Sequence, residues 1–458
     1  MNKILNQSAK TGLLIILAAS FFGSSAPASI MTVKGPAFTL SAREGYITTP
    51  DGGAYYMWGY ANDNAMGMVM MQYPGPTLEV NQGDMVTITL TNYLEVPVSM
   101  VFPGQTGVAA SGGDSNGLLT QEAAPAGGTV TYTFTATHAG TYLYHSGTNP
   151  ALQIEMGLFG ALIVRPTGYD PMMDKRAYDH ADSAYDYEYL FLFSEMDPRI
   201  HEMAECGMWS QISLTDYWPV LWFINGRCAP DVMLPDHYPL LPHQPYSCIP
   251  RMHPGDRMLL RILGGGRDLH PFHTHGNNFL QIARDGRLLS SNPALGANLA
   301  LSDFTLATAP GMTADCIFTW TGEGLDWDIY GHQQDIDNEP TGDFPGPGDV
   351  DHNSNGVFDS VPLEPHEDPA DHGKPFPVQL PDQKALTFGA MYSGSPFLGA
   401  MGSLPPGEGG MNVYGGYMFM WHSHNEKEMV NYDIFPGGLM TMMFVEPPHA
   451  PIEGGMGH

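Results

Sequence analysis

The chain has 458 residues, of which 48 are acidic and 18 are lysine or arginine, so its formal net charge at pH 7 is -30. This charge repels phosphate backbones and anionic membranes, which excludes nucleic acid as a partner. The length exceeds that of one hydrophobic core, and 54 glycines and 39 prolines between short β-branched runs favour an all-β fold with more than one domain.

Residues 1–28 have the pattern of a secretory signal peptide. Lys3 and Lys10 carry positive charge, residues 12–22 form an apolar run, and the segment around Ala28 offers a small-residue cleavage site. No other apolar run approaches the roughly 20 residues that a membrane-spanning helix needs. We therefore expect an exported protein without a transmembrane segment, located in the periplasm, outside the cell or at the cell surface.

Residues 29–168 are predicted to form a first β-sandwich. The runs MVTITLTN (85–92) and GTVTYTFT (128–135) alternate apolar and polar side chains with the period of two that is typical of strands. Glycine, proline, asparagine and aspartate separate these runs and indicate turns. His145 ends a further run, GTYLYH, and is the first candidate metal ligand along the chain.

Residues 186–448 repeat this pattern and are predicted to form a second sandwich. The polar stretch 167–187 separates the two blocks, and a flexible tail is expected at 449–458. Four cysteines in an exported chain, without C-x-x-C spacing, predict two disulfides rather than a zinc ribbon. The sequence does not rank the three pairings of these cysteines, which are Cys206, Cys228, Cys248 and Cys316.

Two histidine-rich stretches of the second block are candidate metal ligands. HPFHTHG contains His270, His273 and His275, and MWHSH contains His422 and His424. Because side chains alternate in a strand, the two histidines of each H-x-H pair point to one face. If the two strands are neighbours, four imidazoles converge, a donor set that suits copper, zinc or iron. The alternative is that each histidine is an ordinary core or surface residue.

The acidic segment 332–375 lacks apolar periodicity and is expected to be a long loop inserted in the second domain. Its stretch DHNSNGVFD follows the early spacing of a calcium-binding loop, in which oxygen ligands alternate around a glycine. The predicted calcium ligands are Asp351, Asn353, Asn355, Val357 and Asp359. The twelfth position is Pro362, so Glu364 would have to substitute for the usual carboxylate. A solvated acidic loop without calcium is the alternative.

Taken in order, the pieces YPGPTLEVNQGD, TYLYHSG, GLFGALIV, FING, HPFHTHG and MWHSH resemble the multicopper oxidase family. The resemblance covers most of the chain outside the acidic insertion and implies two cupredoxin-like Greek-key β-sandwich domains. It further implies copper as cofactor, a type 1 copper that takes electrons from substrate, and a trinuclear cluster that passes them to dioxygen. The substrate would be a small molecule or a metal ion.

The resemblance also implies that several copper ligands are missing. Val101 and Pro103 occupy both histidine positions of the family's first motif, and Gly147 replaces the partner of His145 in the second. In the third motif, all three positions are kept. The implied roles are type 1 ligand for His270, type 2 ligand for His273 and type 3 ligand for His275.

The fourth motif lacks what a type 1 copper requires. His422 and His424 match type 3 ligands, but Ser423 replaces the cysteine between them and Glu428 replaces the next histidine. Without a thiolate, the strong copper–sulfur bond and its blue absorption cannot form. We expect an exported copper-binding protein whose oxidoreductase activity, if retained, proceeds without a type 1 relay.

Two alternatives remain open at this point. One is a non-catalytic extracellular protein that uses the sandwich for metal binding or surface assembly. The other is a homotrimer resembling copper nitrite reductase, in which facing subunits complete the half-empty sites.

Overall fold

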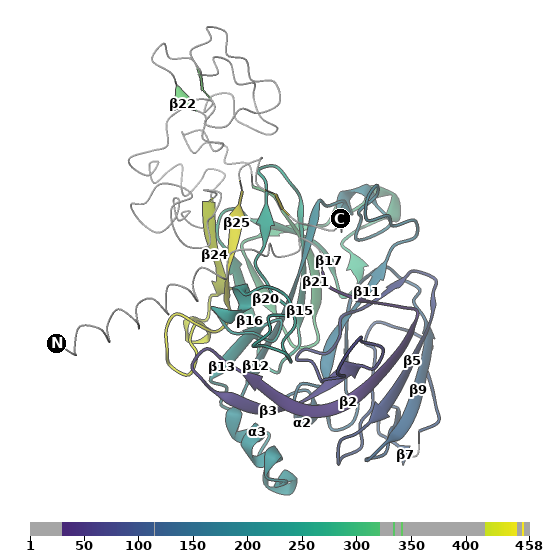
Figure 1. Cartoon of the computed structure of the whole chain (residues 1–458). Helices are drawn as coiled ribbons and strands as arrows, with labels where there is room; N and C mark the ends of the chain where they lie inside the picture. The colour runs from purple at the N-terminus through teal and green to yellow at the C-terminus, as the bar shows by residue number, and fades with distance from the viewer. Residues whose placement is uncertain are drawn as a thin grey trace, which may run out of the picture.

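The computed structural model describes residues 30–113, 115–320, 333–334, 340–341, 417–446 and 451–452. Its regular structure is mostly β, which confirms the predicted all-β fold class (Figure 1). The helical elements of this part of the chain are α2 (Pro150–Gln153), α3 (Pro198–Glu205) and the 3-10 turns η1 (Ala181–Ser183), η2 (Trp209–Gln211), η3 (Asp231–Met233), η4 (Pro293–Leu295) and η5 (Glu426–Glu428). Within these residues, no helix has the length and apolarity to cross a bilayer.

Two sheets are formed by the N-terminal part of the chain. The first has the order β1-β4-β11-β10 and consists of β1 (Val33–Lys34), β4 (Leu78–Asn81), β11 (Phe159–Arg165) and β10 (Gly140–His145). The second has the order β3-β2-β5-β9-β6 and consists of β3 (Ala54–Asn62), β2 (Ala37–Thr48), β5 (Met85–Asn92), β9 (Gly128–Thr135) and β6 (Ala109–Ser111). The short strands β7 (Ser115–Asn116) and β8 (Gln121–Glu122) pair with each other.

Two further sheets follow in the C-terminal part. The larger has the order β13-β12-β15-β21-β17-β18, with β19 also paired to β17; its strands are β13 (Leu221–Ile224), β12 (Tyr187–Met196), β15 (Met258–Gly264), β21 (Thr313–Phe318), β17 (Phe279–Arg284), β18 (Arg287–Leu288) and β19 (Leu301–Asp303). The other has the order β14-β25-β24-β16-β20 and consists of β14 (Arg251–Met252), β25 (Met440–Val445), β24 (Tyr417–Ser423), β16 (His270–Thr274) and β20 (Thr305–Thr308). Strands β22 (Gln333–Gln334) and β23 (Pro340–Thr341) form a separate pair.

Each pair of sheets encloses an apolar core, as the alternating sequence predicts. In β5 and β9 every second side chain is buried, because one face of each strand packs inward while the other faces solvent. Strands β12 and β15 are buried almost throughout, as expected for central strands covered on both faces. A third apolar cluster joins the two halves and includes Met57 and Phe159 from the first and Phe223 and Leu263 from the second.

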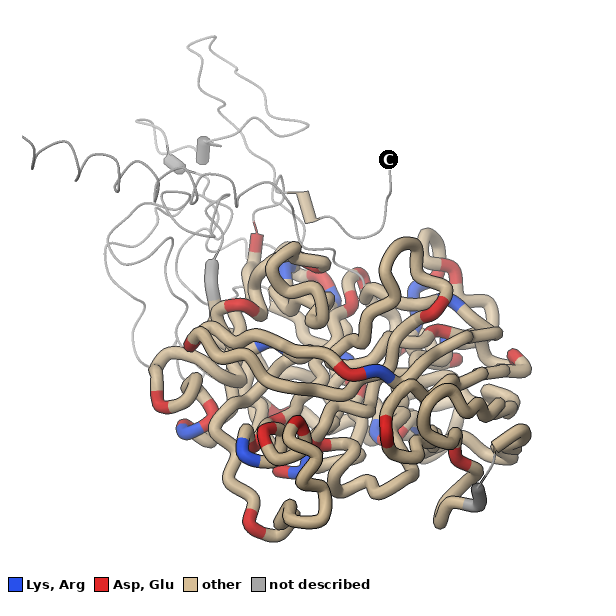
Figure 2. Tube along the Cα trace, turned by 60° about the horizontal axis from the view of Figure 1, so that its bottom comes forward, with Lys and Arg blue, Asp and Glu red and all other residues tan. Residues whose placement is uncertain are grey.

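A buried ion network also crosses between the two halves. Arg165 on β11 makes two hydrogen bonds to the Glu188 carboxylate on β12, with N···O distances of 2.8 and 2.6 Å, and one to Glu79 at 2.9 Å. Glu188 also accepts a hydrogen bond from Arg261 Nε at 2.8 Å. Burial alone would raise the pKa of Glu188, but the two guanidinium groups hold it far below its usual range. Elsewhere, acidic positions are spread along the described chain with basic ones between them (Figure 2).

The prediction of disulfides is wrong. All four cysteines lie within the described residues and are free. Cys206 is exposed at the end of α3, whereas Cys228, Cys248 and Cys316 are buried and pack as small apolar side chains in the cores. Burial raises the pKa of these three buried thiols, which keeps them protonated.

Two predicted segments fall outside the described residues. They are the signal peptide at 1–28 and the loop stretch with the calcium candidates Asp351, Asn353, Asn355, Val357 and Asp359. Both remain predictions, as does the flexible tail at 449–458, of which the structure describes only residues 451–452.

Candidate metal centre

The two histidine-rich stretches form neighbouring antiparallel strands. β16 pairs with β24 in a register that places His273 directly opposite His422. Residues opposite each other on such strands project to the same face, so the two imidazoles share one side of the sheet. Their ring centroids lie 5.5 Å apart. The two H-x-H strands are thus neighbours, which is the condition for their imidazoles to converge.

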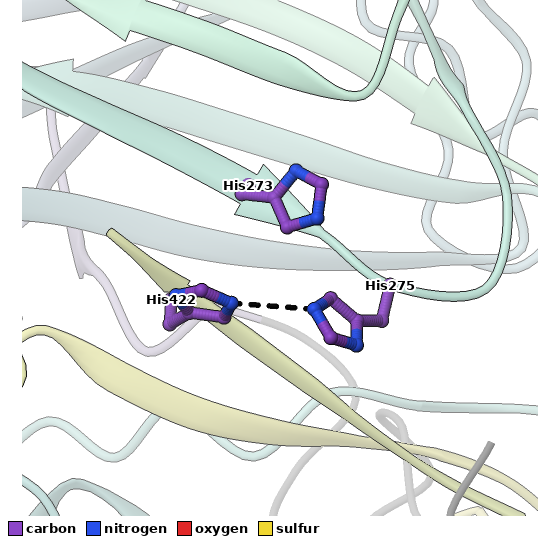
Figure 3. A group of neighbouring side chains, drawn as sticks. All are labelled: His273, His275 and His422. Carbon is purple, nitrogen blue, oxygen red and sulfur yellow. Dashed lines mark hydrogen bonds between the residues drawn. The ribbon is translucent and has the colours of Figure 1, made fainter. Parts of the chain in front are cut away.

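His275 completes a group of three imidazoles at the end of β16. One ring nitrogen each from His273, His275 and His422 lies within 4.8 Å of the other two, and Figure 3 shows the three rings turned toward a common space. His275 lies just beyond the strand, and its backbone carbonyl accepts a hydrogen bond from Trp421 Nε1 at 2.9 Å. The indole therefore ties the turn after β16 to strand β24.

His424 borders this group on its exposed side. Its ring centroid is 4.7 Å from that of His273 and 5.5 Å from that of His422. Its Nδ1 lies 3.3 Å from a carboxylate oxygen of exposed Glu426. Four imidazoles therefore gather on one face, three of them closely enough to share a single ion.

The ring nitrogens that face the space are suited to metal binding. His422 Nδ1 lies 2.7 Å from the carbonyl oxygen of Ser423, and a carbonyl only accepts, so this nitrogen carries the hydrogen. In the neutral ring, His422 Nε2 then keeps its lone pair, and it is this atom that faces His275 Nε2 at 3.2 Å. His273 Nδ1 is held by Thr305 Oγ1 on β20 at 2.8 Å, which orients that ring.

The electrostatic surroundings favour neutral rings. Burial, followed by the proximity of His273, His422 and His424, lowers the pKa of His275 to about 4. Burial also lowers the pKa of His422. Neutral imidazole nitrogens are ligands for copper, zinc and iron, so the donor set present here fits a copper ion.

His145 does not belong to this group. It ends β10, and its Nδ1 lies 2.9 Å from the carbonyl oxygen of Ser146, so it repeats the local arrangement of His422. The convergent group among the described residues does not include it. Across from it, Val101 pairs with His145 through backbone hydrogen bonds of 2.8 and 3.2 Å. A Cβ on Gly147 would lie 2.7 Å from Val101 Cγ1, so these two positions pack closely against each other.

His270 also stands apart, in a different environment. It is fully buried on β16, with one ring nitrogen 2.9 Å from Glu428 and the other 2.9 Å from Glu195. The sequence pointed to Glu428 but not to Glu195 or Thr305. The only signal for Glu195 is a carboxylate at the end of the apolar run YLFLFSEM.

Comparison with known proteins agrees with this architecture. Residues 55–168 match the family model of multicopper oxidases. An L-ascorbate oxidase of Cucurbita pepo var. melopepo is 30% identical over 182 residues, which cover 38% of this chain and 30% of that protein. Laccase-1 of Cryptococcus neoformans var. neoformans is 33% identical over 113 residues, or 24% of this chain and 18% of that protein. The chain therefore covers less than a third of either relative's own length.

Solved structures share the fold over most of the chain. A blue copper oxidase from Nitrosomonas europaea superposes with a TM-score of 0.52 at 19% identity, covering 90% of this chain and 86% of that one. The multicopper oxidase mgLAC superposes equally well, with a TM-score of 0.52 at 18% identity, covering 92% and 88%. At this identity the structural likeness shows the cupredoxin fold alone. The relationship to multicopper oxidases rests on the sequence matches. The segment of residues 55–168 therefore matches the multicopper oxidase family, and the rest of the chain shares the fold of its solved members.

Proposed function

We propose that this chain is a copper protein whose ion is held by His273, His275 and His422, with His424 at the open side. The match of residues 55–168 to the family model supports copper as the metal. The observation that supports this location is the convergence of three ring nitrogens within 4.8 Å of one another. The ligands come from two paired strands and one tied turn, so their positions are fixed before an ion arrives. Preorganised donors of this kind favour binding because little order has to be imposed on them.

The proposed activity is copper-dependent oxidoreduction of a small molecule or a metal ion, without a type 1 relay. Bound copper would supply one-electron exchange with a substrate. The chain contributes the neutral nitrogens that hold the ion, the Thr305 hydroxyl that orients His273, and an exposed imidazole, His424, at the side from which a substrate would approach. Ser423 occupies the position of the family's type 1 copper cysteine. The chain therefore has no thiolate at this position to transfer electrons to the flanking histidines.

A non-catalytic role in metal binding or surface assembly is the second candidate. It is favoured by the close approach of Val101 to Gly147, since the Val101 side chain occupies the space beside Gly147 and both positions hold histidines in the family. Four-electron reduction of dioxygen needs more metal centres than one group of four imidazoles supplies.

The metal assignment is tested by elemental analysis after dialysis. We expect the wild type to keep copper and the double variant His422→Ala, His424→Ala to lose it. His138→Ala serves as the control, because it removes an exposed imidazole outside the group. Equal copper in the wild type and the double variant would refute the assignment. Oxygen uptake with phenols or cuprous ion then separates an oxidase from a binding protein.

Two further proposals concern location and assembly. The pattern of residues 1–28 supports export, and the N-terminal sequence of protein recovered from the periplasm or medium tests it. We also propose that facing copies in a homotrimer complete the half-empty site of His145, an imidazole that lies outside the convergent group of the described residues. Native mass measured together with copper content tests this assembly, and a monomer with a full copper complement would exclude it.

A further inference from the structure

The surroundings of His270 differ from those of a metal ligand. The resemblance assigns His270 to a type 1 copper, yet both of its ring nitrogens face carboxylate oxygens: Nδ1 lies 2.9 Å from Glu428 Oε2, and Nε2 lies 2.9 Å from Glu195 Oε2. An ionised carboxylate only accepts hydrogen bonds, so a ring in this position carries two hydrogens and a positive charge. We infer that His270, Glu195 and Glu428 form a closed ionic triad in which protons, and no metal ion, join the imidazole to both carboxylates.

The geometry of the triad does not suit a chelated ion. The two carboxylates bind opposite sides of one ring, whereas metal ligands converge on a point. Both nitrogens would have to lose their hydrogens or their partners before either could bind copper. The convergent group of the described residues accordingly contains His273, His275 and His422 but not His270.

The surrounding loop is shaped around Glu195. Its Oε1 accepts hydrogen bonds from the backbone N–H of Arg267 at 2.5 Å, from that of Asp268 at 2.9 Å, and from the Tyr217 hydroxyl at 3.0 Å. A Cβ on Gly266 would lie 1.9 Å from Glu195 Oε2, so only glycine allows the loop to pass this close. The glycine-rich turn before β16 thus closes over the carboxylate.

The residues that replace copper ligands support the other side of the triad. Glu428 Oε1 accepts a hydrogen bond from Asn425 Nδ2 at 2.9 Å, and the backbone N–H of Asn425 donates to Ser423 Oγ at 3.1 Å. Ser423 therefore stabilises the turn that delivers Glu428 to His270. Ser423 and Glu428, which replace two copper ligands of the family, thus act together with Glu195 to hold His270.

Copper content of isosteric variants tests whether the triad excludes metal. Glu428→Gln and Glu195→Gln keep the shape of each side chain and remove a charge that a copper ligand would need. We expect both to hold as much copper as the wild type, whatever that amount is. Loss of one equivalent in either variant would overturn the inference. His273→Ala, measured in parallel, reports on the histidine group separately, so failure of the proposed copper site does not affect this comparison.

Two spectroscopic measurements give independent readouts. In protein with 15N-labelled histidine, we expect one imidazole to keep both nitrogens protonated at mildly alkaline pH, and its signal to move in Glu428→Gln. A neutral tautomer for His270 at that pH would contradict the triad. In Ser423→Cys, added copper is expected to give no strong thiolate–copper absorption, because Glu428 still occupies His270 Nδ1. An intense visible band in this variant would show that copper enters the site.

Discussion

His273 and His422 lie directly opposite each other on β16 and β24, with ring centroids 5.5 Å apart. Backbone pairing fixes this relationship, and a shift of one residue would turn one ring to the other face of the sheet. The hydrogen bond from Trp421 to the carbonyl of His275 adds the third ring. The candidate centre is therefore built on paired strands and not on free loops. Single substitutions can test each residue that orients its rings.

Thr305→Val is expected to weaken copper binding. It removes the hydroxyl that lies 2.8 Å from His273 Nδ1, and loss of such an orienting partner commonly costs about 10–100-fold in metal affinity. Thr308→Val is a matched control on the same strand, because the buried Thr308 hydroxyl has no hydrogen-bond partner. Copper affinities from competition titrations should fall for Thr305→Val only. Equal affinities would remove Thr305 from the site.

Stability should depend on pH through His270. Burial alone would lower the pKa of His270, but hydrogen bonds to Glu195 and Glu428 raise it from 6.5 to about 9. The charged form of His270 is thus favoured in the folded protein. Its contribution to the free energy of unfolding is complete below pH 6.5 and is lost as the pH rises through about 9. The size of the effect is roughly 3 kcal/mol, since one pKa unit corresponds to about 1.4 kcal/mol.

Chemical unfolding across this pH range measures the effect. Wild-type stability should fall with rising pH, and the fall should be smaller in Glu428→Gln, which removes one of the two carboxylates. Other titratable or charged groups beside the triad include Asp268, Tyr217 and Lys427, and Arg267 and Glu155 both contact Tyr217. Parallel pH profiles for the two proteins would show that Glu428 does not set the charge of His270.

Gly147→Ala is expected to destabilise the first sandwich by about 1–3 kcal/mol, as overpacking does in tight sites. The added Cβ would lie 2.7 Å from Val101 Cγ1 and 3.1 Å from Ser99 Oγ. Shortening Val101 to alanine should relieve most of this cost, so the double variant should be more stable than the sum of the single effects predicts. Additive free energies of unfolding would mean that the two positions do not limit each other.

Glu188→Gln should destabilise the junction between the two halves by about 3–5 kcal/mol, because it leaves two buried guanidinium groups without their shared partner. Asp216→Asn is the control, since Asp216 and its partner Arg199 form an exposed pair whose loss should cost less than about 1 kcal/mol. The free energies of unfolding of both variants are compared with that of the wild type. Similar small losses would show that the buried network is replaceable.

Much of the candidate site follows from local sequence. The spacing of His273 to His275 and of His422 to His424 places each pair on one face, because the period of a strand is two, and the structure has both pairs on a shared face. The alternating runs of β5 and β9 likewise predict their buried faces. The prediction of disulfides failed because it rested on the expected compartment and on the number of cysteines, and not on distances between them.

Contacts between distant segments could not be predicted in this way. Glu195 is 75 residues before His270 and Thr305 is 32 residues after His273, and neither belongs to a motif. The separation of His145 from the other histidines is likewise a property of how the two sandwiches pack.

The sequence by itself determined the β architecture, the face of each H-x-H pair and the absence of a thiolate, because these depend only on strand periodicity and residue chemistry. The tertiary structure decided which strands are neighbours, and thus that three imidazoles meet while His270 is enclosed by two carboxylates. That choice depends on sheet register and on burial of charges among strands far apart in the chain, which no local pattern encodes.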